Sequence, residues 1–156
     1  MKKLPYGEAD FLVHIFTKDF GKMDVLAKGA RKSGAKLNAH IDILNHVRIS
    51  FVKSGERMPT LIDAEVINRH DDWFLDADKI SIAGRMLQTL DLLIPIAEKD
   101  EILFATILNF FGGGKSVQDF LPIFFAHQGY GKNPDFSLLP SEISQSILTL
   151  WPALKN

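Results

Sequence analysis

The sequence predicts an α+β protein, with a small barrel or sandwich of short strands over residues 1–67 and a helical domain over residues 68–156. In the first part, apolar and polar residues alternate in short runs separated by tight turns. From Trp73 onward, apolar residues recur at the spacing of a helix. The charge also divides: residues 1–57 hold 11 Lys and Arg against 6 Asp and Glu, whereas residues 58–156 hold 7 against 13. A basic half is typical of a polyanion-binding surface. The acidic half should repel a polyanion, so we expect it to contact another kind of partner.

The composition is that of a globular protein of the cytoplasm. With 46% apolar and 24% charged residues in a chain of 156, wholesale disorder is not expected. The chain contains no cysteine, which excludes a disulfide framework and a thiolate metal site and fits a reducing compartment. No apolar signal-peptide core follows Met1, and the longest apolar run, residues 102–111, is too short to span a bilayer.

Four short strands are predicted in the first half. Over residues 11–16, Phe11, Val13 and Ile15 alternate with Leu12, His14 and Phe16. A turn at residues 18–22 then leads to a second strand at residues 23–27. After a polar loop, residues 46–51 alternate again, and residues 61–67 run back beyond another turn. Short strands joined by tight turns are expected of a small barrel or sandwich.

The second half predicts helices. Apolar residues fall at helical spacing over residues 80–94 and 117–125, and residues 102–111 are apolar nearly all round, as a buried helix would be. A final helix is predicted at residues 141–151. The join at residues 68–72 is short and contains neither Gly nor Pro, so we expect the two domains to pack together.

The clearest candidate site is a polar loop at residues 28–36 that carries four cations: Lys28, Arg31, Lys32 and Lys36. The small residues between them keep the backbone accessible to phosphates, and such contacts gain affinity from counterion release without reading base sequence. We expect a wider DNA-binding surface that adds three cations and one aromatic side chain for base stacking, namely Arg48, Lys53, Arg57 and Tyr6. The alternative is a solvated surface loop.

Three patterns in the sequence resemble enzyme or metal sites, but each lacks residues or a structural context that such a site requires. Residues 112–116, Gly-Gly-Gly-Lys-Ser, resemble the end of a phosphate-binding loop, but Asn109 replaces the first glycine and a helix is predicted where a strand is required. The five histidines lack the paired spacing of zinc ligands. The acidic residues at 71–78 lack the glycine and glutamate of a calcium loop. We therefore expect no catalytic residue, no metal and no cofactor.

An ordered series of motifs runs through the first half of the chain. Residues 5–10 read Pro-Tyr-Gly-Glu-Ala-Asp, an alternating strand follows, residues 21–22 are Gly-Lys, and residues 27–31 read Ala-Lys-Gly-Ala-Arg. Residues 63–66, Asp-Ala-Glu-Val, close the series. Each motif is common, but their order and spacing are not. The series resembles the amino-terminal domain of the RecO family, and residues 120–130 resemble more weakly a helix end in its second domain.

This resemblance implies an OB-fold barrel followed by an α-helical domain. It implies a non-enzymatic protein of DNA recombination and repair that binds single- and double-stranded DNA, anneals strands coated by single-strand-binding protein, and works with RecR to load RecA. Most members have a further strand before the Tyr-Gly-Glu motif, whereas only residues 1–4 precede it here. We therefore expect a shortened first strand and either a partly open sheet or a gap filled by another molecule. Some members hold zinc through cysteines, which this shorter chain lacks.

The resemblance also implies that the helical domain binds the acidic carboxy-terminal tail of single-strand-binding protein, which ends in an apolar aromatic residue. Such a tail requires a hydrophobic groove with a cation at its rim. Arg85 and Lys132 are candidates for the rim, and Leu87, Phe124 and Phe125 for the walls. The same apolar residues lie on helical stripes, so they also fit a core.

Two other classes of function stay open. A protein–protein adaptor of the repair machinery that has lost DNA binding would fit the shortened first strand and the acidic second half. The cationic loop at residues 28–36 favours DNA binding instead. An enzyme is the third class, and no residue pattern supports it.

Overall fold

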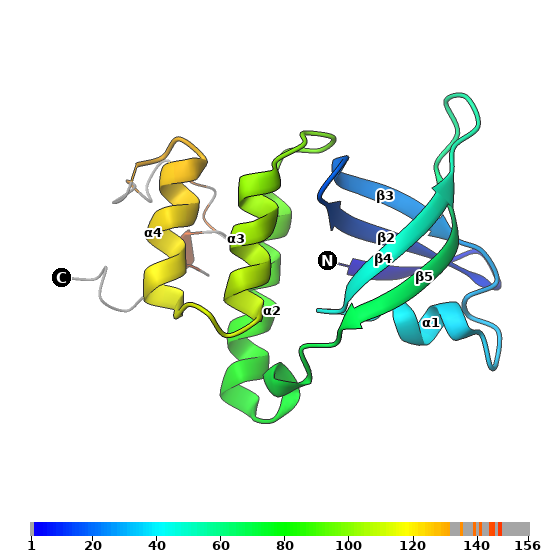
Figure 1. The fold of residues 1–156 in the computed structure, drawn as a ribbon, viewed down its shortest axis with the longest axis horizontal. Helices are drawn as coiled ribbons and strands as arrows, with labels where there is room; N and C mark the ends of the chain where they lie inside the picture. Colours follow the sequence, from blue (N-terminus) through cyan, green and yellow to red (C-terminus); the bar gives the residue numbers. More distant parts are fainter. Residues whose placement is uncertain are drawn as a thin grey trace. The chain divides into compact units, whose positions relative to one another are not determined.

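The computed structural model describes residues 2–131 together with Asp135, Leu139, Ser141, Ser144, Gln145 and Ile147 (Figure 1). The chain divides into two compact units. The first comprises Met1–His70 and Ile96–Lys99, and the second comprises Asp71–Pro95 and Asp100–Asn156. None of the described helices is long and apolar enough to cross a membrane.

The first unit is a five-stranded sheet with the strand order β1-β2-β3-β5-β4. The strands are β1 Lys2–Tyr6, β2 Asp10–Thr17, β3 Gly21–Ala27, β4 His46–Val52 and β5 Thr60–Asn68. β1, β2 and β3 form an antiparallel meander, β3 pairs in parallel with β5, and β5 pairs antiparallel with β4. A short helix that the sequence did not predict, α1 Lys36–His40, lies between β3 and β4. This arrangement is an OB-fold, as expected.

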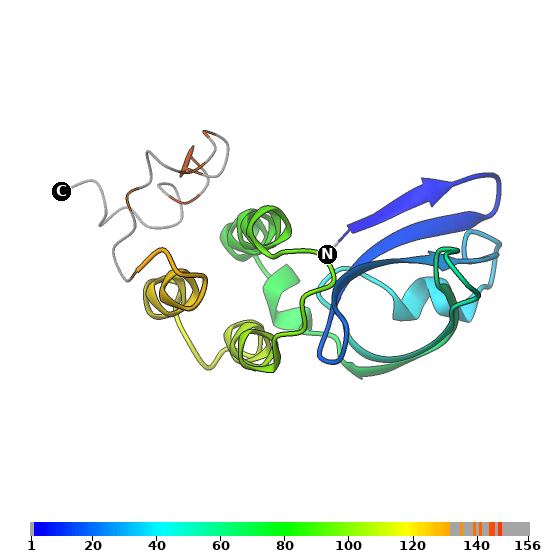
Figure 2. The same ribbon diagram turned by 90° about the horizontal axis from the view of Figure 1, so that it is seen from above.

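The barrel is open between its first and fourth strands. Within the described residues β1 pairs with β2 alone and β4 with β5 alone, so both are edge strands. Figure 2 shows β1, in dark blue, standing apart from the curved β4 and β5. The prediction of a partly open sheet is confirmed, although β1 extends as far as Tyr6, two residues beyond the expected end.

Apolar side chains from β2, β3 and β5, joined by two from the β3–β4 connection, form the core of the first unit. The buried core of this unit consists of Val13, Val25, Ala27, Ala30, Ile41, Leu61 and Ala64. Larger inward-facing side chains, including Phe11, Ile49 and Phe51, pack against this core but are only partly buried. Their exposure follows from the open sheet, because a closed barrel would cover the inner face on all sides.

Residues 96–99 return from the helical part of the sequence to the start of β3. The Ala97 N–H donates to the Lys22 carbonyl at 2.8 Å, and Lys22 forms a parallel bridge with Ile96. Gly21, at φ +67°, makes this approach possible, because a Cβ there would collide with the backbone of Glu98. The start of β3 is therefore held from both sides.

The second unit contains the 3₁₀ helix η1 Asp71–Phe74 and the helices α2 Ala77–Leu93, α3 Glu101–Phe111 and α4 Val117–His127. Each α-helix starts at a side-chain cap: Asp76 accepts from the Lys79 N–H, Asp100 from Leu103 and Ser116 from Asp119. The three predicted helices are thereby confirmed. Of the helix predicted at residues 141–151, the described residues Ser141, Ser144, Gln145 and Ile147 are helical, and its other positions lie outside the described residues.

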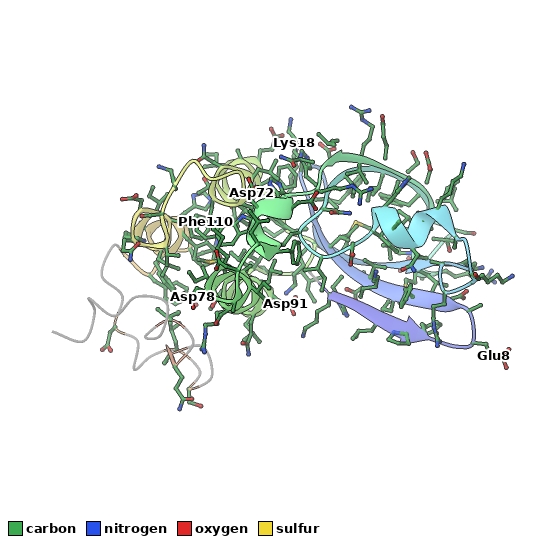
Figure 3. The ribbon with its side chains drawn as sticks, turned by 90° about the horizontal axis from the view of Figure 1, so that it is seen from below. Glu8, Lys18, Asp72, Asp78, Asp91 and Phe110 are labelled. Atoms are coloured by element: carbon green, nitrogen blue, oxygen red, sulfur yellow. The ribbon has the colours of Figure 1, made fainter. Side chains whose placement is uncertain are left out.

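Aromatic side chains fill the core of the second unit. Phe110, Phe120, Phe124 and Phe125 are at most 1% exposed, and the rings of Phe110 and Phe120 lie 4.7 Å apart. Trp73 packs on Phe110 at 5.3 Å, and its indole N–H donates to the Phe111 carbonyl at 2.7 Å. Figure 3 labels Phe110 among these packed side chains. Aromatic pairs at such distances add to the stability that burial alone provides.

Candidate nucleic-acid interface

The segment at residues 28–36, called here the cationic loop, connects β3 to the first residue of α1. Its four cations, Lys28, Arg31, Lys32 and Lys36, are all exposed. The backbone between them forms successive turns, in which the Lys32 N–H donates to the Gly29 carbonyl and the Ala35 N–H to the Lys32 carbonyl, each at 3.1 Å. The cations are therefore presented on a hydrogen-bonded backbone.

Three hydrogen bonds fix the cationic loop to the β1–β2 turn, and we call them the clamp. The Asp10 carboxylate accepts from the Gly29 N–H at 2.7 Å. The Ala9 carbonyl accepts from the Arg31 N–H at 2.9 Å, and the Arg31 guanidinium donates to the Gly7 carbonyl at 2.8 Å. Two motifs that are separate in the sequence, at residues 5–10 and 27–31, thus form one structural element.

The conformation of Gly29 is part of this clamp. Its φ of +67° lies in the left-handed region, which glycine adopts without the steric cost that a side chain would add. Ala30, the next residue, is 1% exposed and belongs to the core. The loop is therefore anchored by burial as well as by hydrogen bonds.

The structure places the other candidate cations away from the cationic loop. Arg48 lies on β4 and pairs with Glu65 of β5 at 2.7 Å, so a neighbouring carboxylate balances its charge. Lys53 and Arg57 lie in the exposed β4–β5 connection, whose tip extends away from α1 in Figure 1. The base of that connection contacts β3, where the Leu26 N–H donates to the Pro59 carbonyl at 2.8 Å.

Tyr6 is an exposed aromatic residue directly beside the clamp in sequence. It is the last residue of β1, it is 51% exposed, and the clamp residue Gly7 follows it. Phe20 is similarly exposed, but its ring packs edge-on against Phe51 at 5.3 Å. An exposed ring such as that of Tyr6 is free to stack on a base.

The candidate residues of the helical unit differ in exposure. Phe124 and Phe125 are completely buried on α4, so in this structure they belong to the core and do not line an open groove. Arg85 and Leu87 on α2 are partly exposed. Lys132 lies outside the described residues.

The described histidines make structural contacts. His14 pairs with Asp24 across β2 and β3 at 2.6 Å, and His127 pairs with Asp100 at the same distance. His40 contacts the Ala64 carbonyl at 2.5 Å. In the part of the chain that the structure describes, no three His, Asp or Glu side chains gather closely enough to hold a metal ion. Residues 112–116 follow α3, so a helix precedes this stretch where a phosphate-binding loop would need a strand.

Asp10 is the functional candidate that sequence reasoning did not single out. Its contact with Gly29 joins residues that are 19 positions apart, and periodicity within a strand carries no information about such a contact. The only available signal was that the motifs at residues 5–10 and 27–31 occur together.

Comparisons with known proteins agree with this fold. Residues 1–70 match the family model described as "Recombination protein O N terminal". Three proteins named "DNA repair protein RecO" each align over 109 residues, or 70% of this chain. The protein of Thermodesulfovibrio yellowstonii is 27% identical, with 44% of its length covered. That of Gloeothece citriformis is 30% identical, with 38% covered, and that of Acetivibrio thermocellus is 32% identical, with 43% covered.

The chain thus spans less than half the length of these relatives, and the similarity continues beyond the first unit into the helices. An OB-fold with the motifs of residues 5–31, a family match over residues 1–70 and these relatives all support one assignment. Residues 1–70 belong to the RecO family, and the similarity to RecO proteins extends over about 70% of the chain.

Proposed function

We propose that this chain is a non-enzymatic DNA-binding protein of recombinational repair, and that residues 1–67 hold single-stranded DNA so that complementary strands can anneal. The observation that carries the proposal is the cationic loop, which presents four exposed cations on a clamped backbone. The relatives named for DNA repair support the same role.

Contact with phosphates suits strand annealing. Lys and Arg side chains gain affinity by releasing counterions from the DNA backbone, and they leave the base edges free to pair. One stacking residue, Tyr6, would orient the strand without selecting a sequence. The same charge-led contact would also hold double-stranded DNA.

The proposed protein partners come from the family resemblance. They are RecR, with which the chain would assist recombinase loading, and the carboxy-terminal tail of single-strand-binding protein. The tail is acidic, so it requires a cation beside an apolar surface, and we propose that the helical unit supplies both.

A fluorescence-anisotropy titration with a labelled oligonucleotide at several salt concentrations tests DNA binding. If four cations each release a counterion, the plot of log affinity against log salt should have a slope of about −3 for a single strand. Lys32→Glu should weaken binding about tenfold on all sequences alike and reduce the slope by about one. Arg31 is left intact because its guanidinium belongs to the clamp.

Lys79→Glu on α2 is the matched control, because it makes the same charge change on an exposed lysine of the helical unit. Its affinity for DNA should stay close to that of the unmodified chain. If Lys32→Glu binds as tightly as Lys79→Glu, the DNA site lies elsewhere.

A protein–protein adaptor is the second candidate function, and the open edges of β1 and β4 are the observation that favours it. An unpaired edge strand can accept a strand from another chain. No binding of the oligonucleotide even at low salt would support this alternative.

A further inference from the structure

A carboxylate lies inside the proposed phosphate-binding site, where its charge opposes the proposed function. Asp10 is the first residue of β2, and its Oδ1 accepts from the backbone of the cationic loop at Gly29. An anion so close to a phosphate site should repel DNA. Its presence therefore calls for a structural reason.

The contacts of Asp10 supply that reason. The carboxylate binds Gly29 between Lys28 and Arg31, at the point where the chain leaves β3 and turns into the loop. Asp10 is partly buried, so its hydrogen bond is shielded from competing water more than a fully exposed one would be. A carboxylate that accepts from a backbone N–H forms a charge-assisted bond, which is stronger than a neutral one.

We propose that Asp10 is the positioning residue of the DNA site, and that it holds Gly29 so that Lys28, Arg31 and Lys32 meet the phosphates together. This inference rests on the proposed function. A clamped loop loses less conformational entropy when it binds, so its affinity is higher than that of the same charges on a mobile loop. Asp10 thus increases affinity through geometry although its charge alone would lower it.

Substitutions at Asp10 separate geometry from charge because the two make opposite predictions. Asp10→Ala removes the negative charge, so electrostatics alone would strengthen DNA binding, whereas loss of the clamp should weaken it about tenfold. Asp10→Asn removes the charge but keeps an oxygen that can accept from Gly29. Because the bond to Asn is neutral and therefore weaker while the repulsion is gone, the affinity should stay within about threefold of that of the unmodified chain.

Glu8→Ala is the matched control. Glu8 is exposed at the tip of the same β1–β2 turn, where Figure 3 labels it, so its removal changes the charge without removing the Gly29 acceptor. Affinity should stay equal or rise slightly. If Asp10→Ala behaves like Glu8→Ala, or if Asp10→Asn weakens binding as much as Asp10→Ala does, the positioning role is wrong.

The thermal unfolding of each variant is measured first, and the titrations are run well below the midpoints. If Asp10→Ala does not fold, Asp10→Glu replaces it, because glutamate keeps the charge but shifts the carboxylate by one methylene relative to Gly29. Weaker binding of Asp10→Glu would support the proposal, and unchanged binding would overturn it.

Limited proteolysis with trypsin tests the clamp without DNA. Trypsin cuts after Lys and Arg, so cleavage within residues 28–36 reports how often the loop opens. Asp10→Ala should be cut there several-fold faster than the unmodified chain, whereas Asp10→Asn and Glu8→Ala should not. Equal rates would contradict the clamp. If the unmodified chain binds no DNA, the proposed function fails separately, and proteolysis still decides whether Asp10 holds the loop.

Discussion

Two side chains of opposite charge, Asp10 and Arg31, hold the cationic loop against the β1–β2 turn. Arg31 reaches back 24 residues to the Gly7 carbonyl, and Asp10 reaches forward 19 residues to the Gly29 N–H. The sequence predicts the four cations as a group because Lys and Arg residues can be read directly from it. It does not show which charges are engaged in internal contacts, because those depend on how the β1–β2 turn folds.

A second charged pair links two helices of the second unit. Asp100 caps α3 by accepting from the Leu103 N–H at 2.8 Å, and it contacts the His127 ring at 2.6 Å at the end of α4. Burial alone would raise the pKa of Asp100, but the hydrogen bonds from Leu103 and His127 outweigh it and lower the pKa. The Asp100 carboxylate thus caps the start of α3 and contacts the end of α4.

The stability that Asp100 contributes should depend on pH. Because its pKa is lower in the folded chain, the contribution is complete above the ordinary range of an Asp carboxyl and is lost as the pH falls through the folded value. Asp100→Asn keeps an acceptor for the cap but cannot ionise. It should cost about 1 kcal/mol at pH 6, and the cost should shrink below about pH 4.

Urea unfolding of the second unit, followed by the fluorescence of the partly buried Trp73, measures this difference at each pH. The control is Asp91→Asn on α2, an acidic residue outside the α3 cap. A cost of Asp100→Asn that is the same at pH 3 and pH 6 would show that ionisation of Asp100 does not stabilise the fold.

At the scale of elements, periodicity predicted most strands and helices but not the contacts that complete the sheet. The strands β2 to β5 follow the runs predicted at residues 11–16, 23–27, 46–51 and 61–67, and α2 to α4 follow helical stripes. Local patterns missed the short helix α1 and the return of residues 96–99 to Lys22, because that pairing joins segments more than seventy positions apart. Such a contact depends on the tertiary fold.

The edge strand β1 also makes a contact with a distant segment that local sequence patterns do not show. Lys3 is mostly covered, and its ammonium group contacts Asn38 Oδ1 at 3.2 Å and Asp42 Oδ1 at 3.3 Å. It also lies over the Phe11 ring at 5.2 Å. A charged side chain held at an edge strand disfavours uncontrolled pairing with other chains. Lys3 therefore connects the open edge of the sheet to α1.

Gly21→Ala tests the contact between β3 and residues 96–99. A Cβ at Gly21 would collide with the Glu98 backbone, so the substitution must displace this segment as well as strain a residue at φ +67°. We expect a loss of about 2–4 kcal/mol in the free energy of unfolding of the first unit. Hydrogen exchange of the β3 amides measures it locally.

Gly55→Ala is the control, because Gly55 has φ +58° and nothing lies within 4 Å of the position of its Cβ. It should carry the backbone strain alone, about 1 kcal/mol. Equal losses for the two substitutions would mean that the approach of Glu98 adds nothing to stability.

At the scale of the whole molecule, the two units differ in surface charge as the sequence predicted. The acidic residues Asp72, Asp78 and Asp91, labelled in Figure 3, lie on η1 and α2 of the second unit. Such a surface should repel DNA, and an acidic partner could bind this unit only beside a local cation such as Arg85. The sequence predicted the charge of this surface but not its free apolar area, because helical stripes do not distinguish a core from a groove.

The tail of single-strand-binding protein should bind the helical unit through its terminal aromatic residue and its carboxylates. Because Phe124 and Phe125 are completely buried, the apolar wall must come from side chains that remain accessible, and Leu87 on α2 is partly exposed near Arg85 in sequence.

Calorimetry with a tail peptide should give measurable heat, and a peptide without the terminal aromatic should bind at least tenfold more weakly, since burial of that ring supplies most of the affinity. Arg85→Glu should also weaken the intact peptide about tenfold, with Lys79→Glu on the same helix as its charge-matched control. Equal heats for the two peptides, or none for either, would show that the helical unit does not bind this tail.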